Sequence, residues 1–288
     1  MSGDPSAIWI DGGFRPAAGA IAANDRGLLL GDGVFDTALV LNGRVFRQAD
    51  HLSRLMASCA VLGIPVSEAR LEAAMVALAE RCGDGSIRLT VTRGPGPRGL
   101  SAPAEPEPTV FGSLAPLVRH LMFAPVKLAT ARIRRNETSP TSRHKTLAYL
   151  DAVLATGEAK AAGADDALFL NMAGRLASTA LANLFVIDGD RLLTPPLDEG
   201  VLPGITRKWV IENASKAGLT VEETTLPTGA ANGNAMIATN SLRLISPVDR
   251  WDDTAQPRDE RIDILARELR LAIAQECAID PSFFDAAP

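Results

Sequence analysis

The sequence predicts an α+β fold organised in two domains. Strand patterns and helical patterns alternate through the first 110 residues or so, and a second mixture of the two follows a proline-rich stretch. A chain of 288 residues is also longer than a typical single core and fits one large or two medium domains. We expect a small N-terminal α/β domain at residues 1–116, a linker at 117–124 and a larger domain at 125–288.

The predicted elements of the first domain follow from local patterns. Alternating apolar residues indicate strands, Asn42-Gly43 is a strong hairpin turn, and apolar residues at helical spacing indicate two helices. Residues 94–109 are rich in proline and glycine, which predicts a long surface loop. The elements expected here are strands at 7–10, 35–41, 44–46 and 86–92, and helices at 51–62 and from residue 67 onward.

The second domain shows the same two kinds of pattern. A helix from about 143 to 161 is expected from the spacing of Leu147, Leu150 and Leu154, and it would place Lys145 in its first turn. Pro203-Gly204 predicts the start of another helix. The remaining expectations are strands at 126–133, 167–170, 184–187 and 191–193, and helices at about 205–217 and 259–275.

Composition excludes several classes of function. The net charge is −5 and no run of Lys or Arg stands out, which argues against a nucleic-acid partner. No apolar stretch approaches the roughly 20 residues that span a bilayer, and the first residues lack the pattern of a signal peptide. Three cysteines without CxxC spacing argue against disulfides and zinc. We therefore expect a cytoplasmic protein with no bound metal and no membrane partner.

Two glycine motifs lead to different interpretations. Gly94–Gly99 matches GxGxxG, but the proline-rich residues after it do not start a helix, so we reject a dinucleotide site. Leu202–Arg207 is a better anion site, because the free backbone N–H groups and the dipole at a helix start favour a phosphate. By itself this second signal is weak.

Lysine is rare, since nearly all basic residues are arginine. Lysine occurs only at positions 127, 145, 160, 208 and 216. Any chemistry that needs a primary amine therefore has five candidates.

Several motifs, in order over residues 8–250, carry a resemblance to a known family. They are Asp25–Gly27 with Gly31–Thr37, His51–Leu55, Lys145–Leu150, Gly174–Phe185, Thr194–Pro196 with Leu202–Arg207, and Thr239–Val248. The chain resembles the fold-type IV pyridoxal-phosphate enzymes, the class IV aminotransferase family that includes D-amino-acid and branched-chain aminotransferases and aminodeoxychorismate lyase. The resemblance implies a larger domain built on a β-barrel-like sheet with flanking helices.

The same resemblance implies pyridoxal 5′-phosphate as the cofactor and Lys145 as the catalytic, Schiff-base lysine. That lysine would also act as general base and acid at the α-carbon of the substrate. The residues implied in cofactor binding are Arg54, Lys145, Ser178, Thr179, Gly204, Ile205, Thr206, Asn240 and Ser241.

Substrate contacts and assembly are implied in the same way. The segment 93–99 resembles a loop that brings a carboxylate-binding arginine to the active site, often across a dimer interface, and we select Arg98. Leu100 stands where D-amino-acid aminotransferases carry a histidine, and Phe35 replaces a tyrosine. Strict D-alanine specificity is therefore not expected. The expected partners are an amino acid, a 2-oxo acid and a second copy of the chain.

Ser178 is the main departure from the family. The family places a glutamate there, which keeps the ring nitrogen of the cofactor protonated, whereas a hydroxyl only hydrogen-bonds a neutral nitrogen. An aminotransferase remains our first hypothesis. Because the electron sink should be weaker, an aminodeoxychorismate lyase-like β-elimination that releases pyruvate is the second. A non-catalytic cofactor-binding protein is the third.

Overall fold

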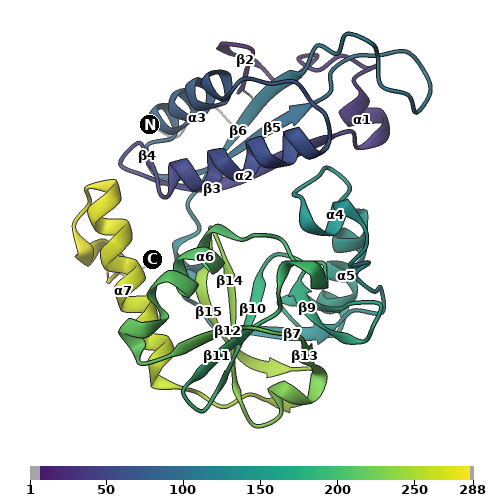
Figure 1. Cartoon of the computed structure of the whole chain (residues 1–288). Helices are drawn as coiled ribbons and strands as arrows, with labels where there is room; N and C mark the ends of the chain where they lie inside the picture. Colours follow the sequence, from purple (N-terminus) through teal and green to yellow (C-terminus); the bar gives the residue numbers. More distant parts are fainter. Residues whose placement is uncertain (1–6, 286–288) are drawn as a thin grey trace. The chain divides into compact units, whose positions relative to one another are not determined.

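The structure is a computed structural model that describes residues 7–285 (Figure 1). The chain forms two compact units. The first contains residues 7–118, 145–148 and 273–285, and the second contains 119–144 and 149–272. The domain ranges expected from the sequence assigned 145–148 and 273–285 to the larger domain.

An antiparallel sheet of six strands is the centre of the first unit, with strand order β2-β1-β6-β5-β3-β4. Its long strands β3 and β5 pair in register from Gly33 opposite Thr92 to Val40 opposite Gly85. The hairpin predicted at Asn42-Gly43 is confirmed, because β3 also pairs with β4, Val40 opposite Val45. The pairing of β3 with β5 was not predicted. The strands are β1 (Ala7–Ile10), β2 (Gly13–Pro16), β3 (Gly33–Leu41), β4 (Arg44–Val45), β5 (Gly85–Thr92) and β6 (Thr109–Pro116).

Helices α2 (Gln48–Val61) and α3 (Glu68–Cys82) pack against this sheet and enclose its apolar core (Figure 1). The side chain of Ser67 accepts a hydrogen bond from the Arg70 N–H and caps α3, as the sequence predicted for a helix beginning there. A short helix, α1 (Arg26–Leu30), precedes β3.

The second unit contains a mixed sheet that closes into a barrel. Strands β10, β14, β15, β7, β8 and β9 follow one another around it, and the pair Ser178–Asn183 joins β9 back to β10. This closure confirms the barrel-like sheet that the resemblance implied. It also places Ser178 in the wall of the barrel. The strands are β7 (Val126–Thr130), β8 (Asp166–Leu170), β9 (Arg175–Thr179), β10 (Asn183–Asp188), β11 (Arg191–Thr194), β12 (Thr220–Glu223), β13 (Leu226–Pro227), β14 (Ala235–Asn240), β15 (Leu244–Trp251) and β16 (Thr254–Ala255).

In the second part of the chain, the helices expected at 143–161 and 205–217 are shorter than the sequence predicted, whereas the helix expected at 259–275 is present at about that length. Instead of one helix over 143–161, the structure has α4 (Pro140–Arg143) and α5 (Leu150–Ala161), so the prediction that Lys145 lies in a helical turn is wrong. The others are α6 (Ile205–Asn213) and α7 (Glu260–Cys277). Single 3₁₀ turns are η1 (Arg119–Leu121), η2 (Leu197–Glu199), η3 (Ala214–Ala217), η4 (Thr228–Ala231) and η5 (Pro281–Phe284).

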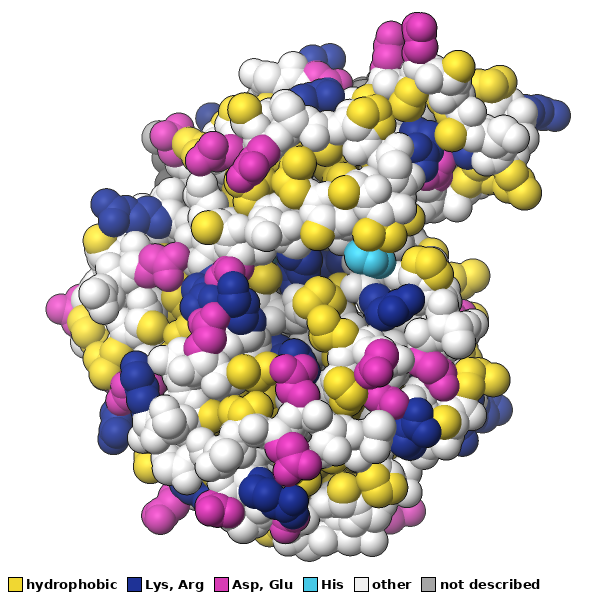
Figure 2. Space-filling model, in the orientation of Figure 1, with side chains coloured by type: hydrophobic (Ala, Val, Ile, Leu, Met, Phe, Trp, Pro, Cys, Tyr) yellow, Lys and Arg dark blue, Asp and Glu magenta, His cyan; other side chains and the backbone are white. Residues whose placement is uncertain are grey.

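The surface carries charges of both signs. On the face shown in Figure 2, basic and acidic side chains are interspersed, in agreement with the small net charge. Between residues 7 and 285, no helix has the length and apolar character needed to cross a bilayer.

Candidate active site

Lys145 lies in an extended segment that pairs with the beginning of β3. The Phe35 N–H donates to the Lys145 carbonyl at 2.8 Å, and the Leu147 N–H donates to the Gly33 carbonyl at 3.0 Å. These two bonds satisfy backbone groups that a helix would otherwise use internally, which is why the helical pattern begins only at Leu150. The pairing fixes Lys145 directly beside Phe35.

The side chains of Lys145 and Arg88 both lie against the Phe35 ring. The Lys145 Nζ is 4.5 Å from the ring centre, and the Arg88 guanidinium carbon is 3.5 Å from it. Of the five lysines, four are exposed and Lys145 alone is partly shielded. The sequence reasoning missed Arg88, although a charge in the middle of the apolar strand Ile87–Val91 was a signal for it.

Arg54 is held by a buried carboxylate. Its Nε and Nη2 donate to Asp36 at 2.9 and 2.8 Å, and His51 Nδ1 lies 2.6 Å from the same carboxylate. Burial alone would raise the pKa of Asp36, but the charges of Arg54 and His51 and their hydrogen bonds outweigh it and lower that pKa to about 2. Asp36 therefore stays ionised and fixes the plane of the Arg54 guanidinium.

Arg98 and Leu100 lie at the tip of the long loop between β5 and β6. Both side chains are exposed, and Leu100 is 85% exposed. The loop itself confirms the surface loop predicted for the proline-rich stretch. Lys145, Phe35, Arg54 and this loop all belong to the first unit.

In the second unit, helix α6 begins after Gly204, whose Cβ position is already occupied. A Cβ on Gly204 would lie 1.9 Å from Oδ1 of Asn183, whose Nδ2 donates to the Leu202 carbonyl at 2.8 Å. The first N–H groups of the helix, at Ile205 and Thr206, have no acceptor inside it. Together with the helix dipole they form a small anion cradle.

A second turn borders this cradle. The Thr206 hydroxyl donates to the Asn240 carbonyl at 2.9 Å, and the Asn240 side chain accepts from the N–H groups of Leu242 and Arg243. Ser241 is thus carried at the tip of a fixed turn. The structure brings the predicted residues at 204–206 and 240–241 together.

Ser178 and Thr179 lie next to the same cradle through Asn183, which pairs with Ser178 across the barrel closure. Ser178 is 8% exposed, and its hydroxyl makes no hydrogen bond within residues 7–285. The Thr179 hydroxyl, in contrast, is already hydrogen-bonded. It donates to the buried Asp166 at 2.6 Å and accepts from the Ala182 N–H at 2.7 Å. Burial raises the pKa of Asp166, against the lowering effect of the Thr179 hydrogen bond.

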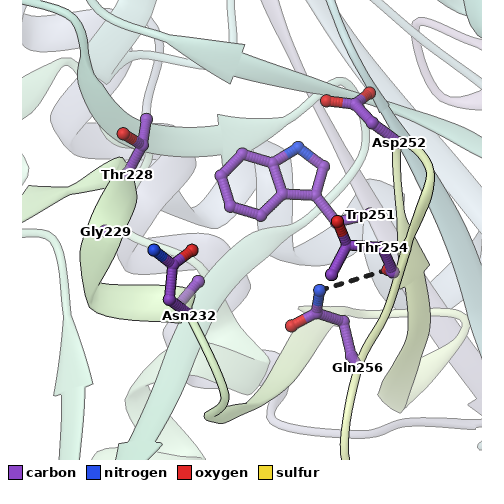
Figure 3. A pocket seen from close by; sticks show the side chains of 8 residues that line it. Thr228, Gly229, Asn232, Trp251, Asp252, Thr254 and Gln256 are labelled. Carbon is purple, nitrogen blue, oxygen red and sulfur yellow. Dashed lines mark hydrogen bonds between the residues drawn. The ribbon is translucent and has the colours of Figure 1, made fainter.

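A separate pocket of about 300 Å³ lies elsewhere in the second unit and contains none of the predicted residues. Figure 3 shows the indole of Trp251 between Thr228 and Asn232 on one side and Gln256 on the other. The indole N–H is already bound to Thr130 at 2.8 Å, and the Gln256 amide nitrogen to the Thr254 carbonyl at 3.3 Å. The carboxylate in its lining, Asp252, accepts hydrogen bonds from the N–H and the hydroxyl of Thr130.

Comparisons with known proteins agree with these features. A family model described as amino-transferase class IV matches residues 33–251. An aminodeoxychorismate lyase of Bacillus subtilis is 27% identical over 261 residues, which cover 85% of this chain and 87% of the lyase.

Two solved structures are similar over nearly the whole chain. The branched-chain aminotransferase of Thermoproteus uzoniensis, with norvaline, has a TM-score of 0.85 at 26% identity, covering 94% of this chain and 95% of its own. The 4-amino-4-deoxychorismate lyase of Pseudomonas aeruginosa has a TM-score of 0.82 at 31% identity, covering 93% and 98%.

Proposed function

Because this chain belongs to the class IV aminotransferase family, we propose that it transfers an amino group between an amino acid and a 2-oxo acid with pyridoxal 5′-phosphate bound at Lys145. One observation carries the proposal: Lys145 is the single lysine that is partly shielded, and it lies against an aromatic ring beside an arginine. The residues fit the cofactor, since a shielded amine suits its aldehyde and the Gly204 cradle suits its phosphate.

Each residue then has a physical task. When bound, the cofactor supplies the electron sink for the bonds of the α-carbon. Lys145 holds the cofactor through its ε-amine and afterwards moves a proton at the substrate α-carbon. The N–H groups of Ile205 and Thr206, with the Ser241 hydroxyl, bind the phosphate, and Arg54 adds its charge.

Substrate recognition falls to arginine side chains. A guanidinium matches a carboxylate with two parallel hydrogen bonds, so Arg98 and Arg88 are the groups we assign to substrate carboxylates. Ser178 provides an unoccupied hydroxyl for the ring nitrogen of the cofactor.

Borohydride trapping tests this proposal. Reduction of the cofactor-loaded protein, followed by peptide mass analysis, should place the adduct on Lys145. K145R should lose the adduct, whereas K160R, which changes an exposed lysine of α5, should keep it. An adduct on another lysine, or none, would overturn the assignment.

A lyase is the second candidate, and Ser178 is the observation that favours it. A hydroxyl holds the ring nitrogen neutral, which weakens the electron sink and favours rapid loss of a leaving group. A lyase should release pyruvate from aminodeoxychorismate without a second oxo acid. A transaminase should instead convert the bound cofactor to its amine form when an amino acid is added, a change that is visible in the absorbance spectrum.

We also propose that the protein acts as a cytoplasmic homodimer. Leu150, Val153 and Leu154 lie on one face of α5 and are 68%, 62% and 53% exposed. Apolar surface of this kind is typical of an interface with another copy. Free thiols at Cys59, Cys82 and Cys277 suit a reducing compartment. Light scattering of the wild type and of L150E/L154E should show a dimer and a monomer, respectively.

A further inference from the structure

One guanidinium holds the tip of the loop that carries Arg98. Arg26 is 3% exposed. Its Nη1 donates to the carbonyls of Gly99 and Ser101 at 3.0 and 3.2 Å, and its Nη2 donates to that of Leu100 at 3.0 Å. Three consecutive carbonyls therefore converge on one side chain more than 70 positions away in the sequence.

The main chain around Arg26 holds the base of the same loop. The Arg26 N–H donates to the Gly94 carbonyl at 3.0 Å, and the Gly96 N–H donates to the Asn24 carbonyl at 3.2 Å. A Cβ on Gly96 would lie only 3.0 Å from Cδ of Arg26. The loop is thus bound to residues 24–26 at both its base and its tip.

Asp32 anchors the Arg26 side chain. The Asp32 carboxylate accepts from Nε of Arg26 and from Nε of Arg93, each at 2.8 Å. Arg93 continues to the carbonyls of Leu62 and Gly63, both at 2.7 Å, after the end of α2. Because these groups directly follow α2 and β5, the guanidinium of Arg26 has little freedom to follow a moving loop.

We propose that Arg26 is a positioning residue, which holds the loop tip so that Arg98 and Leu100 are presented to the substrate in one orientation. This inference rests on the proposed function. An arginine that is already oriented loses less freedom when a carboxylate binds, so the clamp lowers the KM rather than raising the kcat. Lysine cannot replace Arg26, since its single ammonium does not span three carbonyls.

Cleavage by trypsin measures how firmly the loop is held, and this measurement does not depend on the enzymatic activity of the protein. The Arg98–Gly99 bond is exposed in the loop, but a protease requires the segment to open before it cuts, so cleavage follows the population of the open form. In R26K and R26Q, native-state cleavage after Arg98 should be about tenfold faster or more. R132Q, which removes an exposed ion pair with Glu158, is the matched control and should cleave at the wild-type rate.

A second variant, placed in the loop itself, distinguishes opening of the loop from a general loss of folding in the Arg26 variants. Gly99 has a φ of +118° with open space around its Cβ position, so G99A strains the backbone of the tip while the Arg26 side chain itself is unchanged. G99A should cleave faster in the same way. Thermal unfolding of all variants gives the stability of the whole chain for comparison.

Kinetics then test positioning itself. R26K and G99A should raise the KM for the carboxylate substrate about tenfold, with kcat and the cofactor absorbance near wild type. Unchanged cleavage after Arg98 would overturn the clamp. Faster cleavage with an unchanged KM, or a fall confined to kcat, would overturn the positioning role. Loss of cofactor trapping at Lys145 in the wild type would instead refute the proposed function, while the cleavage result would still decide whether the clamp exists.

Discussion

The guanidinium of Arg88 lies 3.5 Å from the centre of the Phe35 ring, on which Lys145 also rests. Two cationic side chains at one ring make a positively charged spot next to the amine that we assign to catalysis. Cations over an aromatic face are stabilised by the ring quadrupole, and Arg88 gains a fixed orientation from the stacking. An anionic substrate group is the natural partner for such a spot.

Replacing Arg88 should therefore weaken substrate binding. We expect R88M to raise the KM for the carboxylate substrate by about tenfold to a hundredfold, because a hydrogen bond to a charged group contributes roughly 1.5–3 kcal/mol. R88K keeps the positive charge but loses the two parallel N–H donors of the guanidinium. Its KM should therefore lie between those of the wild type and R88M. Steady-state kinetics check this, and a wild-type KM in R88M would mean that the stack is structural only.

Asp36 should matter for stability and for its pH dependence. D36N leaves the buried Arg54 without its counter-charge, so we expect a loss of about 3–5 kcal/mol in the free energy of unfolding. The pKa of Asp36 is lowered to about 2 from 3.8, so its stabilisation is present above about pH 4 and is lost as pH falls towards 2. Urea titrations over this range should show the wild type approaching D36N. A gap of constant size would contradict the prediction.

Ser178 offers a test of the chemistry. S178E restores a carboxylate opposite the ring nitrogen, and we expect transamination to rise roughly tenfold, a change of about 1.4 kcal/mol in the barrier. S178T keeps a hydroxyl and serves as the control. Half-reaction rates with an amino acid, followed by absorbance, measure the effect. An equal or lower rate in S178E would refute the electron-sink argument.

Gly204 should be intolerant of even a methyl group. Its Cβ position is occupied by Asn183, so G204A must displace the residue that joins the α6 start to the barrel closure. We expect cofactor affinity to fall and unfolding free energy to drop by about 1–3 kcal/mol. G157A, in the open middle of α5, should instead gain about 0.5–1 kcal/mol. Cofactor titration and urea unfolding of both variants distinguish these outcomes.

Local patterns predicted much of the fold. The β3–β4 hairpin, the cap of α3 at Ser67 and the start of α6 after Gly204 depend on neighbouring residues, so the sequence alone contains their signals. Strands β14 and β15 were not expected. Both are buried members of the barrel, and such strands lack the alternation that marks a half-exposed one.

The candidate site was harder to predict where long-range contacts decide it. Lys145 was found from its motif, but its backbone conformation depends on pairing with Phe35, more than 100 positions earlier. The Asp25–Gly27 motif was recognised in the sequence. The carbonyls that Arg26 binds were not predicted, because the conformation of the loop decides which carbonyls reach its guanidinium. The roles of the cofactor and substrate residues remain predictions that the experiments above address.

The first unit is assembled from three separate pieces of chain, and this has a consequence for its synthesis. Asn42 donates to the carbonyls of Cys277 and Ala278, and the Arg47 N–H donates to Glu276. A ribosome that has made only residues 1–118 has therefore not yet made the groups that complete this corner, or the 145–148 segment that pairs with β3. Completion of the N-terminal unit must wait until residues 273–278 have been synthesised, so deleting that segment should damage the unit that is made first.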